Sequence, residues 1–222
     1  MNQHLKFKTP FTAIIAGPTS SGKTLLTRKI LRHYQTVFYP TPQYRPLKVL
    51  WAYGQWQPLY NVALPNVQVT YYNGLPPSEE LENQHLIVID DLMSEAENSK
   101  DLVKLFARGS HHNNQNVIFI TQNLFHKGQR DMSLNSHYII LMKNPRDSSQ
   151  IQPLARQMDP LNWRYIVDAY RQATEQSHGY LLFDLCQDTP QSLRFRTRIT
   201  PEESGSGKLE PIVFKPDVSK FT

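Results

Sequence analysis

The sequence predicts an α/β fold in three layers, with a mostly parallel central sheet between helices. Three observations support this prediction. Six short apolar runs recur between residues 11 and 144, segments with helical spacing separate several of them, and no apolar run approaches the eighteen residues of a membrane span. Strands that are apolar at nearly every position are typical of a parallel sheet buried on both faces. The 222-residue chain is long enough for one such domain with a substantial core.

The expected strands are the apolar runs themselves, at residues 11–17, 48–54, 67–72, 85–91, 116–123 and 137–144. Apolar residues at three- and four-residue spacing predict crossover helices in KTLLTRKILRHY (23–34) and SKDLVKLFARG (99–109). Two further helices are expected over 148–159 and 160–176. Two strands follow them, GYLLFDL (179–185) and LRFRTRI (193–199), which we expect to extend the same sheet.

The domain prediction is one unit over residues 1–200, followed by a C-terminal tail over 201–222 that is rich in Pro, Glu, Ser, Gly and Lys. The single cysteine, Cys186, lies in an apolar run and is expected to pack in the core. One cysteine allows no internal disulfide, which fits a reducing intracellular compartment. A net charge of +5 and a pI near 9.2 permit contact with a polyanion without requiring it.

The stretch GPTSSGKT, residues 17–24, matches the phosphate-loop pattern G-x-x-x-x-G-K-[ST] in full, between an expected strand and an expected helix. The glycines let backbone N–H groups turn toward phosphate oxygens, and the helix N-terminus adds partial positive charge. Lysine neutralises the β- and γ-phosphates, and threonine offers a hydroxyl to Mg²⁺. A chance glycine-rich turn is the alternative, and the flanking elements argue against it. The motif therefore predicts ATP and Mg²⁺ binding by Gly17, Pro18, Thr19, Ser20, Ser21, Gly22, Lys23 and Thr24.

The second motif is LIVIDD, residues 86–91, in which four apolar residues precede two aspartates. A buried strand that ends in carboxylates places them at the carboxyl edge of the sheet, where ligands of open α/β sheets bind. We expect Asp90 to hold Mg²⁺ and Asp91 to act as the general base toward the attacking water, with Glu95 as the nearby substitute. Alternatively, the pair caps the following turn.

The third motif is VIFITQN, a buried strand that ends in Thr121, Gln122 and Asn123. An amide at the end of the strand beside the aspartate strand can contact both the γ-phosphate and the water. Gln122 is therefore a candidate sensor of the bound nucleotide, although polar residues also end ordinary strands.

With these motifs, the chain resembles P-loop ATPases of the FtsK/HerA type. It is most similar to the genome-packaging ATPases of double-stranded DNA viruses, including poxvirus-type relatives, and of virus-like Maverick/Polinton elements. The resemblance spans roughly residues 11–160. The segments that carry it are GPTSSGKT, LIVIDDLMSE, LFARGSHHNNQNVIFITQNLF and SLNSHYIILMKNPRD.

This resemblance implies a RecA/FtsK-like P-loop fold with the amide strand beside the aspartate strand, and a homo-oligomeric ring that hydrolyses ATP to package double-stranded DNA. The implied partners are duplex DNA, further copies of the chain, and a viral capsid or its portal vertex. The implied place of action is the host nucleus or a viral assembly site, or the virion itself.

In such rings an arginine reaches the neighbouring subunit's nucleotide. The matching position here is Arg108, with Arg130 as the competing candidate. Arg108 also fits a helix C-terminal cation that Gly109 caps. The adjacent histidines 111 and 112 are interpreted as surface residues rather than zinc ligands, because neither cysteine nor clustered carboxylates accompany them.

Contact with DNA would need cations on the rim of the ring, and a solvated basic face is the alternative interpretation of each candidate. The segment LRFRTRI carries Arg194, Arg196 and Arg198 on one side of the expected strand, where they face DNA, the capsid portal, a neighbouring subunit or water. The loop candidates are Lys127, Arg130, Lys143, Arg146 and the polar stretch HHNNQN.

Two other functions remain open from sequence. A nucleoside or nucleotide kinase has a comparable size and phosphate loop, but it usually carries a basic lid, and the chain has no arginine-dense segment of that kind. A non-hydrolysing nucleotide switch would not need Lys23, Thr24, Asp90 and Gln122 all to be intact.

Overall fold

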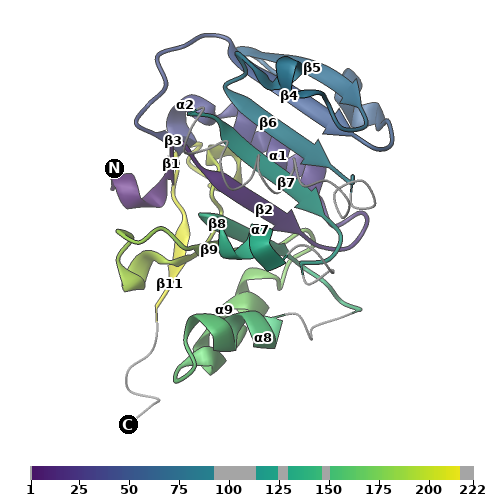
Figure 1. Cartoon of the computed structure of the whole chain (residues 1–222). Helices are drawn as coiled ribbons and strands as arrows, with labels where there is room; N and C mark the ends of the chain where they lie inside the picture. The colour runs from purple at the N-terminus through teal and green to yellow at the C-terminus, as the bar shows by residue number, and fades with distance from the viewer. Residues whose placement is uncertain (1, 93–113, 125–129, 147–150, 216–222) are drawn as a thin grey trace.

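The structure is a computed structural model that describes residues 2–92, 114–124, 130–146 and 151–215. Over these residues, a nine-stranded sheet runs in the order β11-β10-β9-β8-β2-β7-β6-β4-β5 (Figure 1). Its strands are β2 (Thr12–Ala16), β4 (Leu47–Tyr53), β5 (Val67–Asn73), β6 (Leu86–Asp90), β7 (Asn116–Thr121), β8 (Tyr138–Met142), β9 (Tyr180–Asp184), β10 (Phe195–Thr197) and β11 (Ile212–Phe214). A separate small parallel sheet joins β1 (Phe7–Lys8) to β3 (Phe38–Tyr39).

The strands from β8 to β5 in this order are parallel, and β9, β10 and β11 each run antiparallel to their neighbours. The central strand β2 lies between β7 and β8. Because neighbouring parallel strands end at the same edge, the segments after β2, β6 and β7 meet there. This carboxyl edge contains all three motifs that the sequence singled out.

Helices cover both faces of the sheet. Figure 1 shows α1 behind β6 and β7, whereas α8 and α9 lie beside each other below β8 and β9 in this view. Apolar residues of α1 and α2 belong to one core cluster, and those of α7, α8 and α9 belong to the other. The helices are α1 (Lys23–Arg32), α2 (Tyr34–Val37), α3 (Ser78–Leu81), α7 (Arg130–Leu134), α8 (Ile151–Met158) and α9 (Trp163–Ala173), with 3-10 turns η1 (Gln3–Leu5), η2 (Pro58–Asn61), η4 (Gln191–Leu193) and η5 (Pro201–Glu203).

The strands β2, β4, β6, β7, β8 and β9 are largely apolar because each contributes to both cores. In β2, Ala13 and Ile15 pack toward α1, while Ile14 and Ala16 pack toward α8 and α9. All five residues of β2, β6, β8 and β9 are buried. The predicted α/β class with a mostly parallel central sheet is therefore confirmed. None of the helices within the described ranges is long and apolar enough to cross a membrane.

Residues 201–215 differ from the expected tail because they are built onto the sheet. Thr200 caps η5 through a reciprocal interaction with Glu203, and the Tyr180 hydroxyl donates to the same carboxylate at 2.7 Å. Arg32 donates to Glu202 at 2.6 Å. The strand β11 then pairs with β10, and Leu209 is buried. The polar residues of this segment form a capped turn and an ion pair, and the segment is not a free arm.

The interpretation of Arg196 as a residue facing DNA, a partner or water is wrong. Its side chain is buried and donates to Asp184 Oδ2 at 2.8 Å and to the His4 carbonyl at 2.8 Å. Arg194 likewise donates to the carbonyls of Asp184 and Cys186. The strand spans only three residues and Arg198 has a φ of 55°, so the expected alternation breaks and Arg198 alone of the three is exposed. Cys186 is buried in the core, as predicted.

Candidate nucleotide-binding site

The phosphate loop connects β2 to α1 in a conformation that requires its two glycines. The Gly17 N–H donates to the Thr121 carbonyl at 3.2 Å, and a Cβ on Gly17 would lie 2.6 Å from the Cβ of Met142. Gly22 has a φ of 94° and is the N-cap of α1. Ser20 also has a positive φ of 64°. The loop therefore presents backbone N–H groups and the N-terminus of a ten-residue helix at the carboxyl edge of the sheet.

Lys23 lies across this loop. Its Nζ donates to the carbonyls of Gly17 at 2.7 Å and Pro18 at 2.9 Å. Burial lowers the pKa of Lys23, while the nearby carboxylates of Asp90 and Asp91 raise it. A phosphate in the loop would offer the ammonium a negatively charged partner in place of the two carbonyls.

Asp90 ends β6 and is buried, with 3% of its surface exposed. Its Oδ2 accepts hydrogen bonds from the Thr24 hydroxyl at 3.3 Å and the Tyr60 hydroxyl at 2.8 Å. Burial raises the pKa of Asp90, and these two hydrogen bonds oppose that increase. Thr24 and Asp90, the two residues expected to hold Mg²⁺, thus lie within hydrogen-bonding distance of each other, whereas Tyr60 was not among the predicted site residues.

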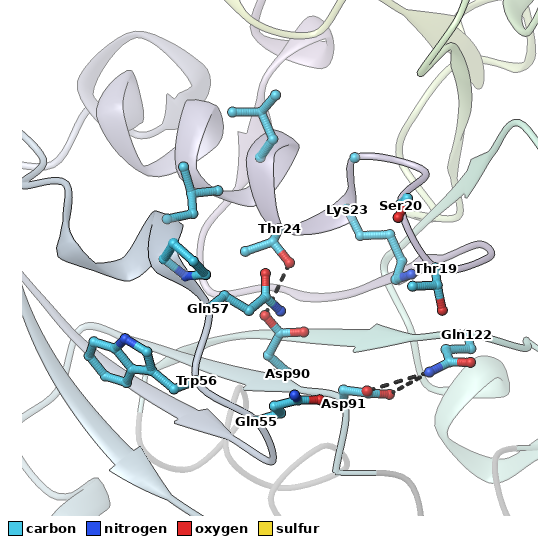
Figure 2. A pocket seen from close by; sticks show the side chains of 14 residues that line it. Thr19, Ser20, Lys23, Thr24, Gln55, Trp56, Gln57, Asp90, Asp91 and Gln122 are labelled. Carbon is cyan, nitrogen blue, oxygen red and sulfur yellow. Dashed lines mark hydrogen bonds between the residues drawn. The ribbon is translucent and has the colours of Figure 1, made fainter.

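Asp91 and Gln122 meet beside Asp90 (Figure 2). The Gln122 amide Nε2 donates to both carboxylate oxygens of Asp91, at 3.1 and 3.4 Å. The contact arises because β7 lies between β2 and β6, so that the end of β7 adjoins the end of β6. Asp91 has a φ of 58°, and a Cβ on Gly54 would lie 2.8 Å from its carbonyl oxygen. The backbone of Asp91 is therefore closely packed against Gly54, whereas the Asp91 side chain is exposed.

A cavity of about 450 Å³ joins these groups. Figure 2 shows Lys23 and Thr24 on one side of it and Asp90, Asp91 and Gln122 along another. The segment after β4 adds residues that the sequence analysis did not select, although it too follows a buried strand at the carboxyl edge. These are Gln55, Trp56, Gln57, Pro58 and Leu59, and the Trp56 side chain is 46% exposed.

The residues present fit a nucleoside triphosphate with Mg²⁺. The hydroxyl of Ser21 is buried in the phosphate loop, and within the described residues it has no hydrogen-bond partner, as expected of a loop that closes around phosphate. The Thr24 hydroxyl and the Asp90 carboxylate supply the oxygen ligands that Mg²⁺ prefers. Thr19 and Ser20 also line the cavity.

Several predicted residues lie outside the described part of the chain, namely Glu95, Arg108, His111, His112 and Lys127. The helix expected over residues 99–109 also lies outside the described part of the chain. Arg130 begins α7, but its side chain is also outside what the structure describes. Of the loop cations that are described, Lys143 donates to the Glu175 carbonyl at 2.8 Å and Arg146 is exposed.

No protein-family model matches the chain, and no curated protein matches it in sequence. Solved structures do share its fold. The genome packaging NTPase B204 from Sulfolobus turreted icosahedral virus 2, in complex with sulfate, matches with a TM-score of 0.54 and 11% identity over 89% of this chain and 96% of that chain. The same NTPase in complex with ATP-gammaS gives 0.52 and 10%, over 98% and 100%.

The flagellar accessory protein FlaH from Methanocaldococcus jannaschii matches with a TM-score of 0.51 and 13% identity, over 95% of this chain and 90% of that chain. At such low identity these likenesses concern the fold. The chain thus has an α/β fold with a large, mostly parallel sheet that matches P-loop NTPase structures.

Proposed function

We propose that this chain is an ATP-hydrolysing motor that moves double-stranded DNA during the packaging of a viral genome. The observation that carries the hydrolytic part is the meeting of three groups in one cavity: a phosphate loop with its lysine, a buried carboxylate bonded to Thr24, and an exposed carboxylate bonded to Gln122. This set provides for phosphate binding, metal binding and proton transfer within one site.

In the proposed mechanism, the N–H groups of the loop and the ammonium of Lys23 bind the phosphates. Thr24 and Asp90 would hold Mg²⁺, which when bound neutralises charge on the phosphates. Asp91 accepts a proton from the attacking water at its carboxylate. Gln122 fixes the orientation of that carboxylate through its amide. Tyr60 keeps Asp90 oriented toward Thr24.

The DNA-packaging part of the proposal has separate support. A solved structure described as the DNA-packaging ATPase of Sulfolobus Turreted Icosahedral Virus has a TM-score of 0.51 over 97% of this chain and 99% of that chain. FlaH has the same fold and another biological role, so the fold alone does not select DNA. The order of the sequence motifs favours the packaging function over the alternatives, and the net charge of +5 permits contact with DNA.

The proposal extends to a ring of identical subunits that acts on duplex DNA at a capsid or its portal vertex, in the host nucleus or at a viral assembly site. In this ring, Arg108 of one subunit stabilises the charge on the γ-phosphate held by its neighbour, with Arg130 as the competing candidate.

The test of the hydrolytic part is phosphate release from ATP by the purified chain, measured beside two variants. Lys23→Ala should lose nucleotide binding, whereas Asp91→Asn should retain binding and lose hydrolysis at least tenfold. Nucleosides and nucleotides are added as phosphoryl acceptors in a parallel reaction. Transfer to an acceptor faster than transfer to water would favour the kinase, and recovery of intact ATP under all conditions would favour the switch.

A further inference from the structure

A second cavity, of about 470 Å³, lies at the same edge of the sheet on the other side of the phosphate loop. It is bordered by the segment between α9 and β9, and by the ends of β10 and β11. Its lining combines apolar groups, such as Phe214, with polar ones that the proposed hydrolysis does not use. The polar lining includes Gln172, Glu175, Gln176, His178 and Arg198.

His178 connects this cavity to the phosphate loop. A Cβ on Gly22 would lie 3.3 Å from the His178 Nδ1 and 3.5 Å from its Cγ, so the imidazole packs directly against the loop. His178 has a φ of 58° and Arg198 a φ of 55°. Left-handed backbone is uncommon outside glycine, and such conformations gather at ligand sites. Ser20 and Asp91, in the first cavity, share this conformation.

The two cavities lie on opposite sides of the phosphate loop, as the two ends of a bound nucleotide would. The proposed function places the γ-phosphate beside Asp90, Asp91 and Gln122, which follow β6 and β7 on one side of β2. The nucleoside at the other end of the triphosphate then leaves the loop toward β8 and β9. His178 and the second cavity lie on that side.

We propose that the second cavity receives the nucleoside of the bound triphosphate, with the imidazole of His178 as the surface on which the base stacks. This inference rests on the proposed function, because it assumes that the γ-phosphate faces the carboxylates. The Gln176 amide offers a donor and an acceptor to the polar edge of the base, and the Glu175 carboxylate accepts hydrogen bonds from ribose hydroxyls.

The competing platform is Trp56, whose exposed ring borders the first cavity. It lies in the segment after β4, beyond β6 from the loop, and therefore on the carboxylate side. A base stacked there would require the triphosphate to bind in the reverse direction, with its γ-phosphate away from Asp91. Trp56 is thus the matched control for His178, because both are ring side chains that border a cavity beside the loop.

The test compares the affinities of ATP and of inorganic tripolyphosphate, which lacks the nucleoside. Both are measured by calorimetry on the wild-type chain, His178→Ala, His178→Phe and Trp56→Ala, with circular dichroism to confirm folding. Base stacking on an aromatic ring contributes at least about 1 kcal/mol, which corresponds to about fivefold in affinity, so His178→Ala should weaken ATP binding about fivefold or more. Tripolyphosphate affinity should change less than about twofold, and His178→Phe should restore ATP binding.

Equal weakening of both ligands by His178→Ala would overturn the inference, because the side chain would then act on the loop itself. Selective loss of ATP binding in Trp56→Ala would overturn it too, and would place the nucleoside in the first cavity. If the wild type binds neither ligand, the proposed function fails and this inference fails with it. If the wild type binds both and His178→Ala changes neither, the inference fails alone.

Discussion

Replacing Arg196 with alanine should destabilise the fold strongly, because it removes one half of a buried ion pair. The guanidinium and the Asp184 carboxylate are each about 1–2% exposed, and their nearest atoms are 2.8 Å apart. The same guanidinium also donates to the carbonyls of His4 and Leu193, and so joins η1 to the β9–β10 edge of the sheet. The substitution leaves a buried carboxylate without its cation and two carbonyls without their donor.

The magnitude follows from these contacts. Removing one partner of a buried pair costs about 3–5 kcal/mol. The carboxylate keeps two donors, the Cys186 N–H at 3.1 Å and the Thr189 hydroxyl at 3.0 Å, which favours the lower end of that range. For a chain of this size, about 3 kcal/mol corresponds to a fall in Tm of roughly 6–12 °C.

The assay is urea and thermal unfolding followed by circular dichroism, with Arg198→Ala as the matched control. Arg198 is exposed, so its replacement should change the free energy of unfolding by less than about 0.5 kcal/mol. The double variant Asp184→Asn with Arg196→Met should be more stable than Arg196→Ala, because no buried charge remains. If Arg196→Ala and Arg198→Ala unfold at the same temperature, the description of Arg196 as a structural residue is refuted.

Three further predictions concern two other residues, Cys186 and Tyr60. Burial, followed by the charge of Asp184, raises the pKa of Cys186 from 9.0 to about 12, so a thiol reagent at pH 8 should label the native chain far more slowly than the urea-unfolded chain. Because the native pKa is the higher one, this group's contribution to stability should be lost as the pH rises above about 9, and Cys186→Ala should remove that slope. Equal labelling rates in the two states would contradict the first expectation. Tyr60→Phe removes the shorter of the two hydrogen bonds to Asp90. A hydrogen bond to a charged group contributes about 1.5–3 kcal/mol, so ATP hydrolysis by this variant should fall about tenfold or more. Tryptophan fluorescence titrated with Mg²⁺ and ATP should show weaker binding in this variant, and an unchanged titration and rate would show that Tyr60 has no such positioning role.

The central strands were predictable because burial on both faces leaves a continuous apolar signal. Each of the six expected runs overlaps an observed strand, and both ends of that strand lie within two residues of the ends of the run. The phosphate loop and the Asp90 and Asp91 pair were predictable because a contiguous motif encodes each of them. The strand order that the family resemblance implied, with the amide strand beside the aspartate strand, is present as β2-β7-β6, and this order brings Gln122 to Asp91.

The remainder depends on contacts between residues far apart in the chain. Tyr60 bonds to Asp90 across thirty positions, and Gly22 contacts His178 from another element altogether. Neither Tyr60 nor His178 stands out in its own segment of the sequence. The alternation in LRFRTRI was misleading because a positive φ at Arg198 ends the strand pattern, and backbone conformation of this kind leaves little trace in a sequence.

The most direct test of the motor proposal is steady-state ATP hydrolysis with and without long duplex DNA, on the wild-type chain, on Lys23→Ala, and on mixtures of Arg108→Ala with Asp91→Asn subunits. The account predicts that duplex DNA stimulates the wild type, that Lys23→Ala is inactive, and that the mixture recovers activity which neither inactive variant has alone. Hydrolysis that ignores duplex DNA, and that Arg108→Ala leaves unchanged, would contradict a ring motor with shared active sites.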